Sequence, residues 1–440
     1  MSTPSGHDKP YSLYRAGTTP DEDVAGAPSG DGGPPRDRGD RGRRRGRRGG
    51  GFVLLLIVLG IIVAAAAGVA AAAGWGPFGG GGEAAAEQAS PAATGAGAAD
   101  LTSAPSAEPS PSASPSPTPA AAPTFSVTAG GDVIGGFGVG GVVESMGSGL
   151  FESIAPTFEK SDFGFVNLES PLTTGGEAQG WKDVVIKGNP DLAPAMAESG
   201  INVVTMANNH AGDMGDSGLL DSIEYCEKYD IAVVGAGEDL DAALKGTVLE
   251  TEDGVRVAFL GFTDVLPVGY PATSSSPGVA PGRADIGAVT KAIRAAAKKA
   301  DFVIVGWHWN FEYKRAPSAL EESEGKAAVD AGADIVFAHH PHLLNGVEAY
   351  HGGLIFYSLG NLVFSGFSGE TAETVLVRAK VSEERIDAQL IPVVGGGSGV
   401  PGVVKGEQAD SILQRFQGFS SALDTNVKIA DGKGYVHLKR

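Results

Sequence analysis

Short apolar runs alternate with amphipathic segments along the chain from residue 124 onward. The runs are rich in Val, Ile, Phe and Ala, and their lengths are typical of buried strands; they lie at 125–128, 164–168, 201–206, 231–234, 255–260, 302–305 and 335–337. Apolar residues with helical spacing between these runs predict helices near 150–159, 216–229, 284–299 and 317–331. This alternation is typical of an α/β domain whose sheets are covered by helices.

After residue 345 the pattern changes, and strands predominate. The apolar runs at 346–350, 354–359, 374–381 and 385–394 follow one another without a long helical segment between them, which favours antiparallel pairing. We therefore expect residues 124–440 to form one large α/β domain. Its architecture would be an αββα sandwich of stacked sheets flanked by helices, with an antiparallel C-terminal part.

The first 75 residues have a different pattern. Residues 1–50 are polar and contain too few apolar side chains to offset the entropy of ordering, so we expect a disordered arm. Residues 52–75 contain no charge and no proline. As a helix they would be about 36 Å long, which is enough to cross a hydrocarbon core of roughly 30 Å.

The arginines between residues 36 and 48 come directly before this apolar segment. Positive charge on that flank favours a cytoplasmic N-terminus. We therefore expect a single-pass transmembrane helix with the C-terminal domain outside the cytoplasm. A cleavable signal peptide is the alternative, because the small residues at 70–73 suit a peptidase, although the apolar run is longer than a usual signal core.

Residues 76–123 consist almost wholly of Gly, Ala, Ser, Pro and Thr. No hydrophobic period is present, and the repeated prolines favour extended, polyproline-like backbone. Fully extended, this segment would span roughly 150 Å. It is therefore predicted to be a linker that holds the domain away from the membrane, within a cell wall.

The chain is acidic, with a net charge of -19 at pH 7 and a pI of about 4.8. This charge argues against nucleic acid as a partner. It also disfavours polyanionic substrates unless metal ions or local basic residues offset it. The single cysteine, Cys226, excludes an intrachain disulfide and shares a helical face with Leu219 and Ile223, which predicts a buried thiol rather than a nucleophile.

Polar side chains that suit metal binding recur where the predicted strands end. Because open α/β sheets build their sites at the carboxyl ends of strands, we expect these residues to lie close together. A mixed set of carboxylate, amide and imidazole donors suits Zn, Mn or Fe. Each residue also has a structural alternative, such as a turn at Asp132 or aromatic packing around His308. The set comprises Asp132, Asn167, Glu169, Asn208, Asn209, His210, His308, His340 and His342.

The densest part of this set is the segment Ala338–His342, which holds three of the eight histidines of the chain. The segment directly follows an apolar run, so its imidazoles lie at the end of a predicted strand. His340 and His342 are alternate residues and are the expected ligands. His339 is expected to pack beside them without binding an ion itself.

In this order and context, the residues resemble the CapA family of bacterial poly-γ-glutamate capsule synthesis proteins, whose domain is related to calcineurin-like metallophosphoesterases. The resemblance covers residues 125–370. It is carried most specifically by Gly332–His342. Further motifs that fit the family are Asn167–Leu172, Ala207–His210, Gly346–Glu348 and Tyr357–Asn361.

The resemblance implies a centre for one or two divalent transition-metal ions. Asp132 would be a ligand of the first ion, Glu169 a bridging carboxylate and Asn209 a ligand of the second ion. His210 would be the catalytic imidazole. In such two-metal sites a bridging hydroxide attacks phosphorus while both cations stabilise the developing charge. The remaining ligands would be His308, His340 and His342, with Asn167, Asn208, His339 and Asn361 around them.

Two positions depart from the family pattern. The Asp-x-His motif of the phosphoesterases is Asp132-Val133-Ile134 in this chain, so one ligand is replaced. Asn310 stands where family members commonly have glycine, two residues after His308. The number of ions and the reaction therefore stay open.

Three functions fit these observations. The first is a membrane-anchored component of extracellular anionic polymer synthesis, export or tethering, which would work beside other capsule-synthesis proteins. The second is a metal-dependent hydrolase that cleaves a phosphoester or an amide in the cell wall. The third is a polymer-binding module that has kept the scaffold without catalysis.

Overall fold

The computed structural model describes residues 122–395 and 397–440. No helix within these ranges is both long and apolar enough to span a bilayer. The arm at 1–50, the transmembrane segment at 52–75 and nearly all of the linker at 76–123 lie outside the described residues, and these predictions stay untested.

The larger sheet has the strand order β17-β18-β15-β14-β1-β2-β3-β4, with β13 paired to β1 and β16 paired to β15. Strands β1 to β4 and β13 are parallel, whereas β14, β15 and β18 are antiparallel. Its strands are β1 (Thr124–Val133), β2 (Phe163–Leu168), β3 (Val203–Thr205), β4 (Ala232–Val234), β13 (Asn361–Val363), β14 (Glu373–Ser382), β15 (Arg385–Val394), β16 (Gly402–Val403), β17 (Lys428–Ala430) and β18 (Lys433–Lys439).

The second sheet has the order β11-β12-β10-β9-β7-β6, and its central strands β12, β10, β9 and β7 are parallel. A two-stranded sheet, β5-β8, lies apart from both. These strands are β5 (Ala236–Gly237), β6 (Thr247–Glu250), β7 (Arg256–Thr263), β8 (Gly278–Val279), β9 (Phe302–His308), β10 (Ile335–His339), β11 (Val347–Tyr350) and β12 (Gly353–Phe356).

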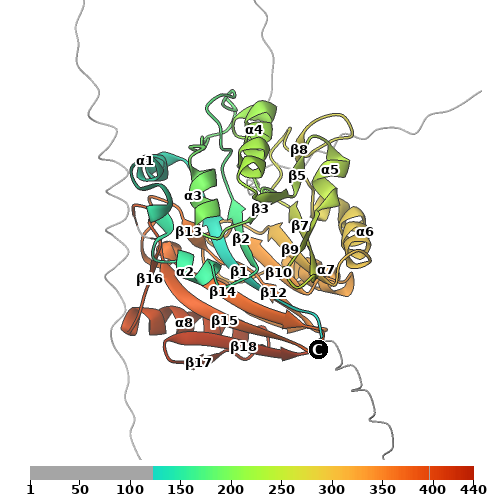
Figure 1. Cartoon of the computed structure of the whole chain (residues 1–440), viewed down its shortest axis with the longest axis vertical. Helices are drawn as coiled ribbons and strands as arrows, with labels where there is room; N and C mark the ends of the chain where they lie inside the picture. Colours follow the sequence, from blue (N-terminus) through green and yellow to red (C-terminus); the bar gives the residue numbers. More distant parts are fainter. Residues whose placement is uncertain (1–121, 396) are drawn as a thin grey trace, which may run out of the picture. The chain divides into compact units, whose positions relative to one another are not determined.

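Helices cover the outer faces of the two sheets (Figure 1). Helices α1 to α4 pack on the larger sheet, and α5 to α7 pack on the six-stranded sheet. The helices are α1 (Phe137–Met146), α2 (Ala155–Phe158), α3 (Leu192–Glu198), α4 (Gly215–Lys228), α5 (Leu240–Lys245), α6 (Ile286–Ala297), α7 (Ala319–Asp330) and α8 (Glu407–Ser421), with 3-10 turns η1 (Gly147–Phe151), η2 (Arg283–Asp285) and η3 (Gly369–Ala372).

The core between the sheets is built from alternate residues of both. In this layer the ring of Phe165 (β2) lies with its centroid 6.2 Å from that of Phe259 (β7) and 5.8 Å from that of Phe337 (β10). Helix α8 closes the lower end of the layer with Phe416 and its neighbours. This arrangement confirms the predicted α/β class, with sheets flanked by helices.

Two predicted elements differ from the structure. The helix expected near 150–159 is split into η1 and the four-residue α2. Pro156 lies in the first turn of α2, a position that needs no N–H donor, and it cannot lie in the interior of a longer helix. Helix α8 lies in the C-terminal part, where we expected mostly strands; Ile412, Leu413 and Phe416 bury one of its faces.

Candidate metal centre

The carboxyl ends of the parallel strands bring the predicted residues to one place. Asp132, near the end of β1, pairs in register with Asn167 of β2 on one side and Asn361 of β13 on the other. The backbone N–H of Asp132 donates to the carbonyl of Gly360 at 2.9 Å. This close approach requires glycine at residue 131, because a Cβ there would lie 1.9 Å from the same carbonyl oxygen.

The six-stranded sheet supplies the imidazoles. His308 is the last residue of β9 and pairs in register with His339, the last residue of β10. His340 and His342 follow directly, and both have positive φ values, 95° and 54°. Such backbone is uncommon for histidine and costs on the order of 1–3 kcal/mol, a pattern often found at functional sites.

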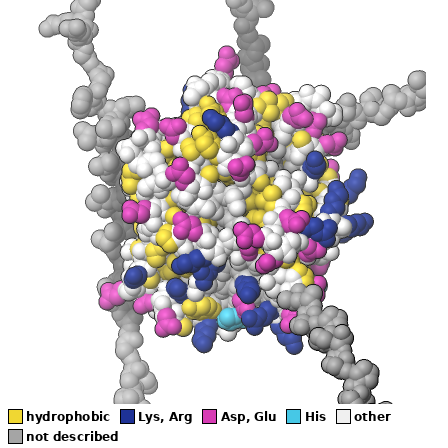
Figure 2. Space-filling view, in the orientation of Figure 1, with side chains coloured by type: hydrophobic (Ala, Val, Ile, Leu, Met, Phe, Trp, Pro, Cys, Tyr) yellow, Lys and Arg dark blue, Asp and Glu magenta, His cyan; other side chains and the backbone are white. Residues whose placement is uncertain are grey.

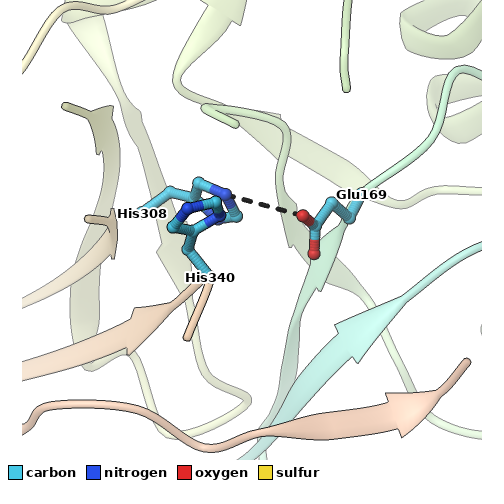
Figure 3. A group of neighbouring side chains, drawn as sticks. All are labelled: Glu169, His308 and His340. Carbon is cyan, nitrogen blue, oxygen red and sulfur yellow. Dashed lines mark ion pairs between the residues drawn. The ribbon is translucent and has the colours of Figure 1, made fainter. Parts of the chain in front are cut away.

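Two groups of possible metal ligands share one carboxylate. Glu169, His308 and His340 offer ligand atoms that lie within 4.8 Å of one another, and so do Asp132, Glu169 and His342. Figure 3 shows the first group, in which the Glu169 carboxylate faces the two imidazoles and lies 3.5 Å from Nε2 of His308. Glu169 therefore lies where a carboxylate that bridges two cations would lie.

Two oxygens of the buried carboxylates have no hydrogen-bond partner among the described residues, and a bound cation would satisfy them. Asp132 and Glu169 are fully buried, and their Oδ2 and Oε1 atoms accept no hydrogen bond within the described part of the chain. A buried polar atom without a partner costs about 1–3 kcal/mol. Carboxylate oxygens beside imidazole nitrogens are suitable donors for Mn, Zn or Fe, so the residues fit the metal that the resemblance implies.

The pKa values of the two buried carboxyl groups, Glu169 and Asp132, are shifted in opposite directions. Burial, together with the charge of nearby Asp132, raises the pKa of Glu169 well above its usual value. Burial acts in the same direction on Asp132, but the imidazoles of His339 and His342, 3.2 and 3.4 Å from its oxygens, outweigh it and lower the pKa of that carboxyl.

The histidines also differ from one another. Burial and the neighbouring His340 lower the pKa of His308, and burial lowers the pKa of His340 to about 3. Both rings are therefore neutral and have a lone pair available for an ion. His342 behaves differently, since Asp132 and Glu169 outweigh burial and raise its pKa to about 9.

Two asparagines fix the positions of the ligands. The amide nitrogen of Asn167 donates to Asp132 at 2.9 Å and to Glu169 at 3.3 Å. Asn208 in turn donates to the amide oxygen of Asn167 at 3.0 Å and accepts from the backbone N–H of His210. Both asparagines are fully buried, and their hydrogen bonds form a continuous chain that ends on the predicted ligands.

Asn209 completes the group around His308. Its amide oxygen lies 2.8 Å from Nε2 of His308, the nitrogen that also faces Glu169. An ion between these residues would therefore have Asn209, Glu169, His308 and His340 as its nearest donors. The role of Asn209 as a ligand of a second ion stays a prediction.

His210 lies beside the ligands and is held by residues to which the sequence analysis gave no role. Its Nδ1 lies 2.7 Å from Asp213 and 3.0 Å from Nζ of Lys182. The hydroxyl of Tyr270 donates to Asp213 at 2.7 Å, and Lys182 lies 2.5 Å from the same carboxylate. The His210–Asp213 spacing of three residues was a visible signal for this contact, whereas nothing marked Lys182 or Tyr270.

His339 and Asn361 lie around the ligands rather than among them. Nδ1 of His339 is 3.2 Å from Asp132 but is not grouped with the other ligand atoms. The Asn361 amide oxygen accepts from Nδ1 of His342 at 2.9 Å, and its nitrogen donates to the backbone of Thr371. The structure thus gathers every predicted site residue, while the roles assigned to them stay predictions.

The two residues that depart from the family pattern, Ile134 and Asn310, each fit their place in the structure. Ile134 packs in the core between the larger sheet and its helices, so its side chain belongs to that layer rather than to the ligand groups. Asn310 has a φ of 71°. Glycine adopts this left-handed backbone without steric cost, and asparagine is among the few other residues that tolerate it.

Comparisons with known proteins agree with this arrangement. Residues 126–366 match the family model described as "Bacterial capsule synthesis protein PGA_cap". The chain is 34% identical over 307 residues to "PGA biosynthesis protein CapA" of Bacillus subtilis (strain 168), covering 69% of this chain and 80% of that protein. It is 36% identical over 259 residues to "Capsule biosynthesis protein CapA" of Bacillus anthracis, covering 58% of this chain and 63% of the other.

Among solved structures, a hypothetical protein from Thermus thermophilus is similar at 14% identity and a TM-score of 0.34, covering 72% of this chain and all of the other. The family model spans more than half of the chain, and the Bacillus subtilis relative is covered over four fifths of its length. The chain therefore belongs to the bacterial capsule synthesis protein family PGA_cap, with the CapA proteins as relatives.

Proposed function

We propose that this chain acts in the synthesis, export or tethering of an extracellular anionic polymer of the poly-γ-glutamate or capsular type. The observation that carries the proposal is the pair of ligand groups that share Glu169, in a domain of the capsule synthesis family. The apolar segment at 52–75 and the Pro-rich segment after it support a membrane-anchored domain outside the cytoplasm.

The site supports a metal centre of the metallophosphoesterase type. Asp132, Glu169 and His342 would hold one cation, and Glu169, Asn209, His308 and His340 would hold a second. When bound, such cations polarise a phosphoryl or carbonyl oxygen and supply positive charge to the transition state. Mn, Zn and Fe all suit this donor set.

The protein's own residues supply orientation and a proton. The buried chain from Asn208 through Asn167 holds the two carboxylates in fixed positions. His210 is 6% exposed, with Asp213 at its Nδ1. Because Asp213 holds Nδ1, the other ring nitrogen is left to donate to a substrate oxygen or to accept a proton from it.

A chromosomal deletion tests the proposed role. We expect the deletion strain to lose surface polymer or its attachment to the cell, and expression of the intact chain to restore it. Surface polymer that is unchanged in amount and attachment would contradict the proposal. Complementation with Glu169→Gln then shows whether the metal centre is required.

Hydrolysis in the cell wall is a second candidate, and the position of His210 beside the ligands favours it. The purified chain, loaded with Mn or Zn, should cleave a phosphoester or a wall amide, and His210→Ala should lose the activity while retaining the metal. If the loaded protein cleaves no substrate while the deletion phenotype holds, the third candidate, a binding module without catalysis, is favoured.

A further inference from the structure

A second candidate site lies on the larger sheet, away from the metal centre. A groove of about 710 Å³ crosses β1, β14, β15 and β18 at the ends opposite to Asp132. Its lining includes the cations Lys160, Arg378, Lys380 and Arg385 and the carboxylates Asp162, Asp253 and Asp387. The cations outnumber the carboxylates in this groove, although the chain as a whole carries a charge of -19.

The groove exists because the helices cover only part of this sheet. Leu376 of β14 is fully buried in the layer beneath the helices. Arg378 and Lys380 follow at alternate positions on the same face and are partly or fully exposed. In Figure 1 the lower parts of β14, β15 and β18 are not covered by helices on the side that faces the viewer.

The side chains of the open face form rows across the strands. Ser126, Lys380, Asp387 and His437 are in register on four neighbouring strands. A second row, two residues along each strand, contains Thr128, Arg378, Gln389 and Tyr435. Neighbouring strands lie about 4.8 Å apart and alternate residues about 6.6 Å apart. Apart from Thr128, which is fully buried, and the acceptor Asp387, these rows present side chains that can donate to an extended chain.

Two of the three acidic residues that line the groove, Asp387 and Asp162, have partners among the described residues. Asp387 pairs with Arg385 and with Nδ1 of His437, each at 2.7 Å. Asp162 accepts from the backbone N–H and the hydroxyl of Ser126, both at 2.7 Å.

Within the described ranges, three cations of the groove have no acidic partner. Lys160, Arg378 and Lys380 form no ion pair with any residue in the described ranges. Figure 2 shows Lys and Arg side chains on the lower part of this face, with Asp and Glu between them.

We infer that this groove binds an extended polycarboxylate chain, the polymer on which the proposed function acts. Arg378 and Lys380 lie on β14 and Lys160 lies in the turn after α2, while the neutral residues Gln389 and Tyr435 continue the row of Arg378 on β15 and β18. This density suits single negative charges that repeat along a chain, and arginine binds carboxylate in two-point geometry. The groove thus supplies the local basic residues that an acidic protein needs to hold a polyanion.

Binding of fluorescein-labelled poly-γ-glutamate to the full-length chain, followed by anisotropy at 50 and 150 mM NaCl, tests the inference. The double variant Arg378→Gln/Lys380→Gln should weaken binding at least tenfold at 50 mM NaCl. The matched control is Lys298→Gln/Lys299→Gln, which removes the same charge from exposed positions at the end of α6. The control should change binding less than twofold, and both variants should unfold at the wild-type temperature.

Equal weakening by the two double variants would show that only net charge matters, and unchanged binding in the groove variant would exclude the groove; either result overturns the inference. So would polyphosphate that displaces the labelled polymer at a tenfold lower concentration, because the groove would then be a phosphate-polymer site.

The identity of the ligand rests on the proposed function, but different experimental results would contradict the proposed function and the groove inference. If deletion leaves surface polymer unchanged while the groove variant still loses binding, the proposed function fails and the groove stands. If deletion removes the polymer while the groove variant binds normally, the proposed function stands and the groove inference fails.

Discussion

The carboxylate of Asp213 lies 2.7 Å from Nδ1 of His210, and the backbone N–H of Asp213 donates to the carbonyl of the same histidine at 3.1 Å. The carboxylate also accepts from Lys182, from Tyr270 and from the backbone of Ile186. Asp213 therefore fixes an imidazole near the ligands that neither ligand group uses. It connects three loops that follow different strands.

Asp213→Asn should destabilise the protein. The substitution keeps the size of the side chain but leaves the largely buried ammonium of Lys182 without its negative partner. Breaking a buried pair from one side typically costs about 3 kcal/mol. Urea unfolding followed by tryptophan fluorescence measures this loss.

A matched pair of variants separates charge from packing at Asp213. Tyr270→Phe removes one hydrogen bond to the carboxylate and should cost about 1 kcal/mol. The double variant Asp213→Asn/Lys182→Met removes both charges and should recover part of the loss. Equal losses of unfolding free energy in Asp213→Asn and in Asp213→Asn/Lys182→Met would contradict an ion pair between Asp213 and Lys182.

Glu169→Gln should abolish the binding of both cations, because both ligand groups require this carboxylate. His308→Ala should reduce binding to a single ion, since His308 belongs to one group. Elemental analysis after Mn or Zn loading and removal of excess metal gives the stoichiometry.

Metal should also stabilise the wild-type chain against heat, since a ligand that binds only the folded state adds stability by mass action. The Glu169→Gln variant should show no such gain. In the absence of metal, its stability should equal or exceed that of the wild type, because a buried carboxyl with a raised pKa has been replaced by a neutral amide. A variant that loses stability without metal would contradict this account of Glu169.

Gly131→Ala should be strongly destabilising. The added Cβ would lie 1.9 Å from the carbonyl oxygen of Gly360, so β1 and β13 would have to separate beside Asp132. We expect a loss of more than about 3 kcal/mol, together with loss of metal binding. Gly141→Ala is the control: it lies in α1 with no atom within 4 Å of the added carbon, and it should be neutral or stabilising by about 0.5–1 kcal/mol.

Cys226 should be unreactive in the folded protein. It is fully buried in α4, and burial raises the pKa of its thiol to about 12, so almost no thiolate exists at pH 8. A colorimetric thiol reagent should label the chain only after guanidinium is added. Stoichiometric labelling of the native protein would show that the helix opens readily.

The ligand residues could be predicted from the sequence because they follow strands. Asp132, His308 and His340 each end or follow an apolar run, and the carboxyl ends of parallel strands meet at one edge. The order of the runs was therefore sufficient to place them together. The predicted burial of Cys226 and the α/β class rest on similar periodic signals and are confirmed.

The surroundings of the site could not be predicted in the same way. Lys182 lies in a polar loop without periodicity, and only tertiary contacts bring it to Asp213. Strand β13 has three residues, too few for a pattern, yet it positions Asn361 against His342. The open face at Arg378 and Lys380 depends on where the helices end over the sheet, which is a property of packing rather than of local sequence.

Strand β1 runs without interruption from the groove to the metal centre. Ser126 lies at one end and Asp132 at the other, six residues apart, which corresponds to about 20 Å at 3.3 Å per residue. A small molecule is too short to contact both sites, whereas a polymer of several repeats is long enough. A ligand that contacted both candidate sites at once would therefore have to span at least this distance, and because β1 is buried between them it would have to pass around the strand.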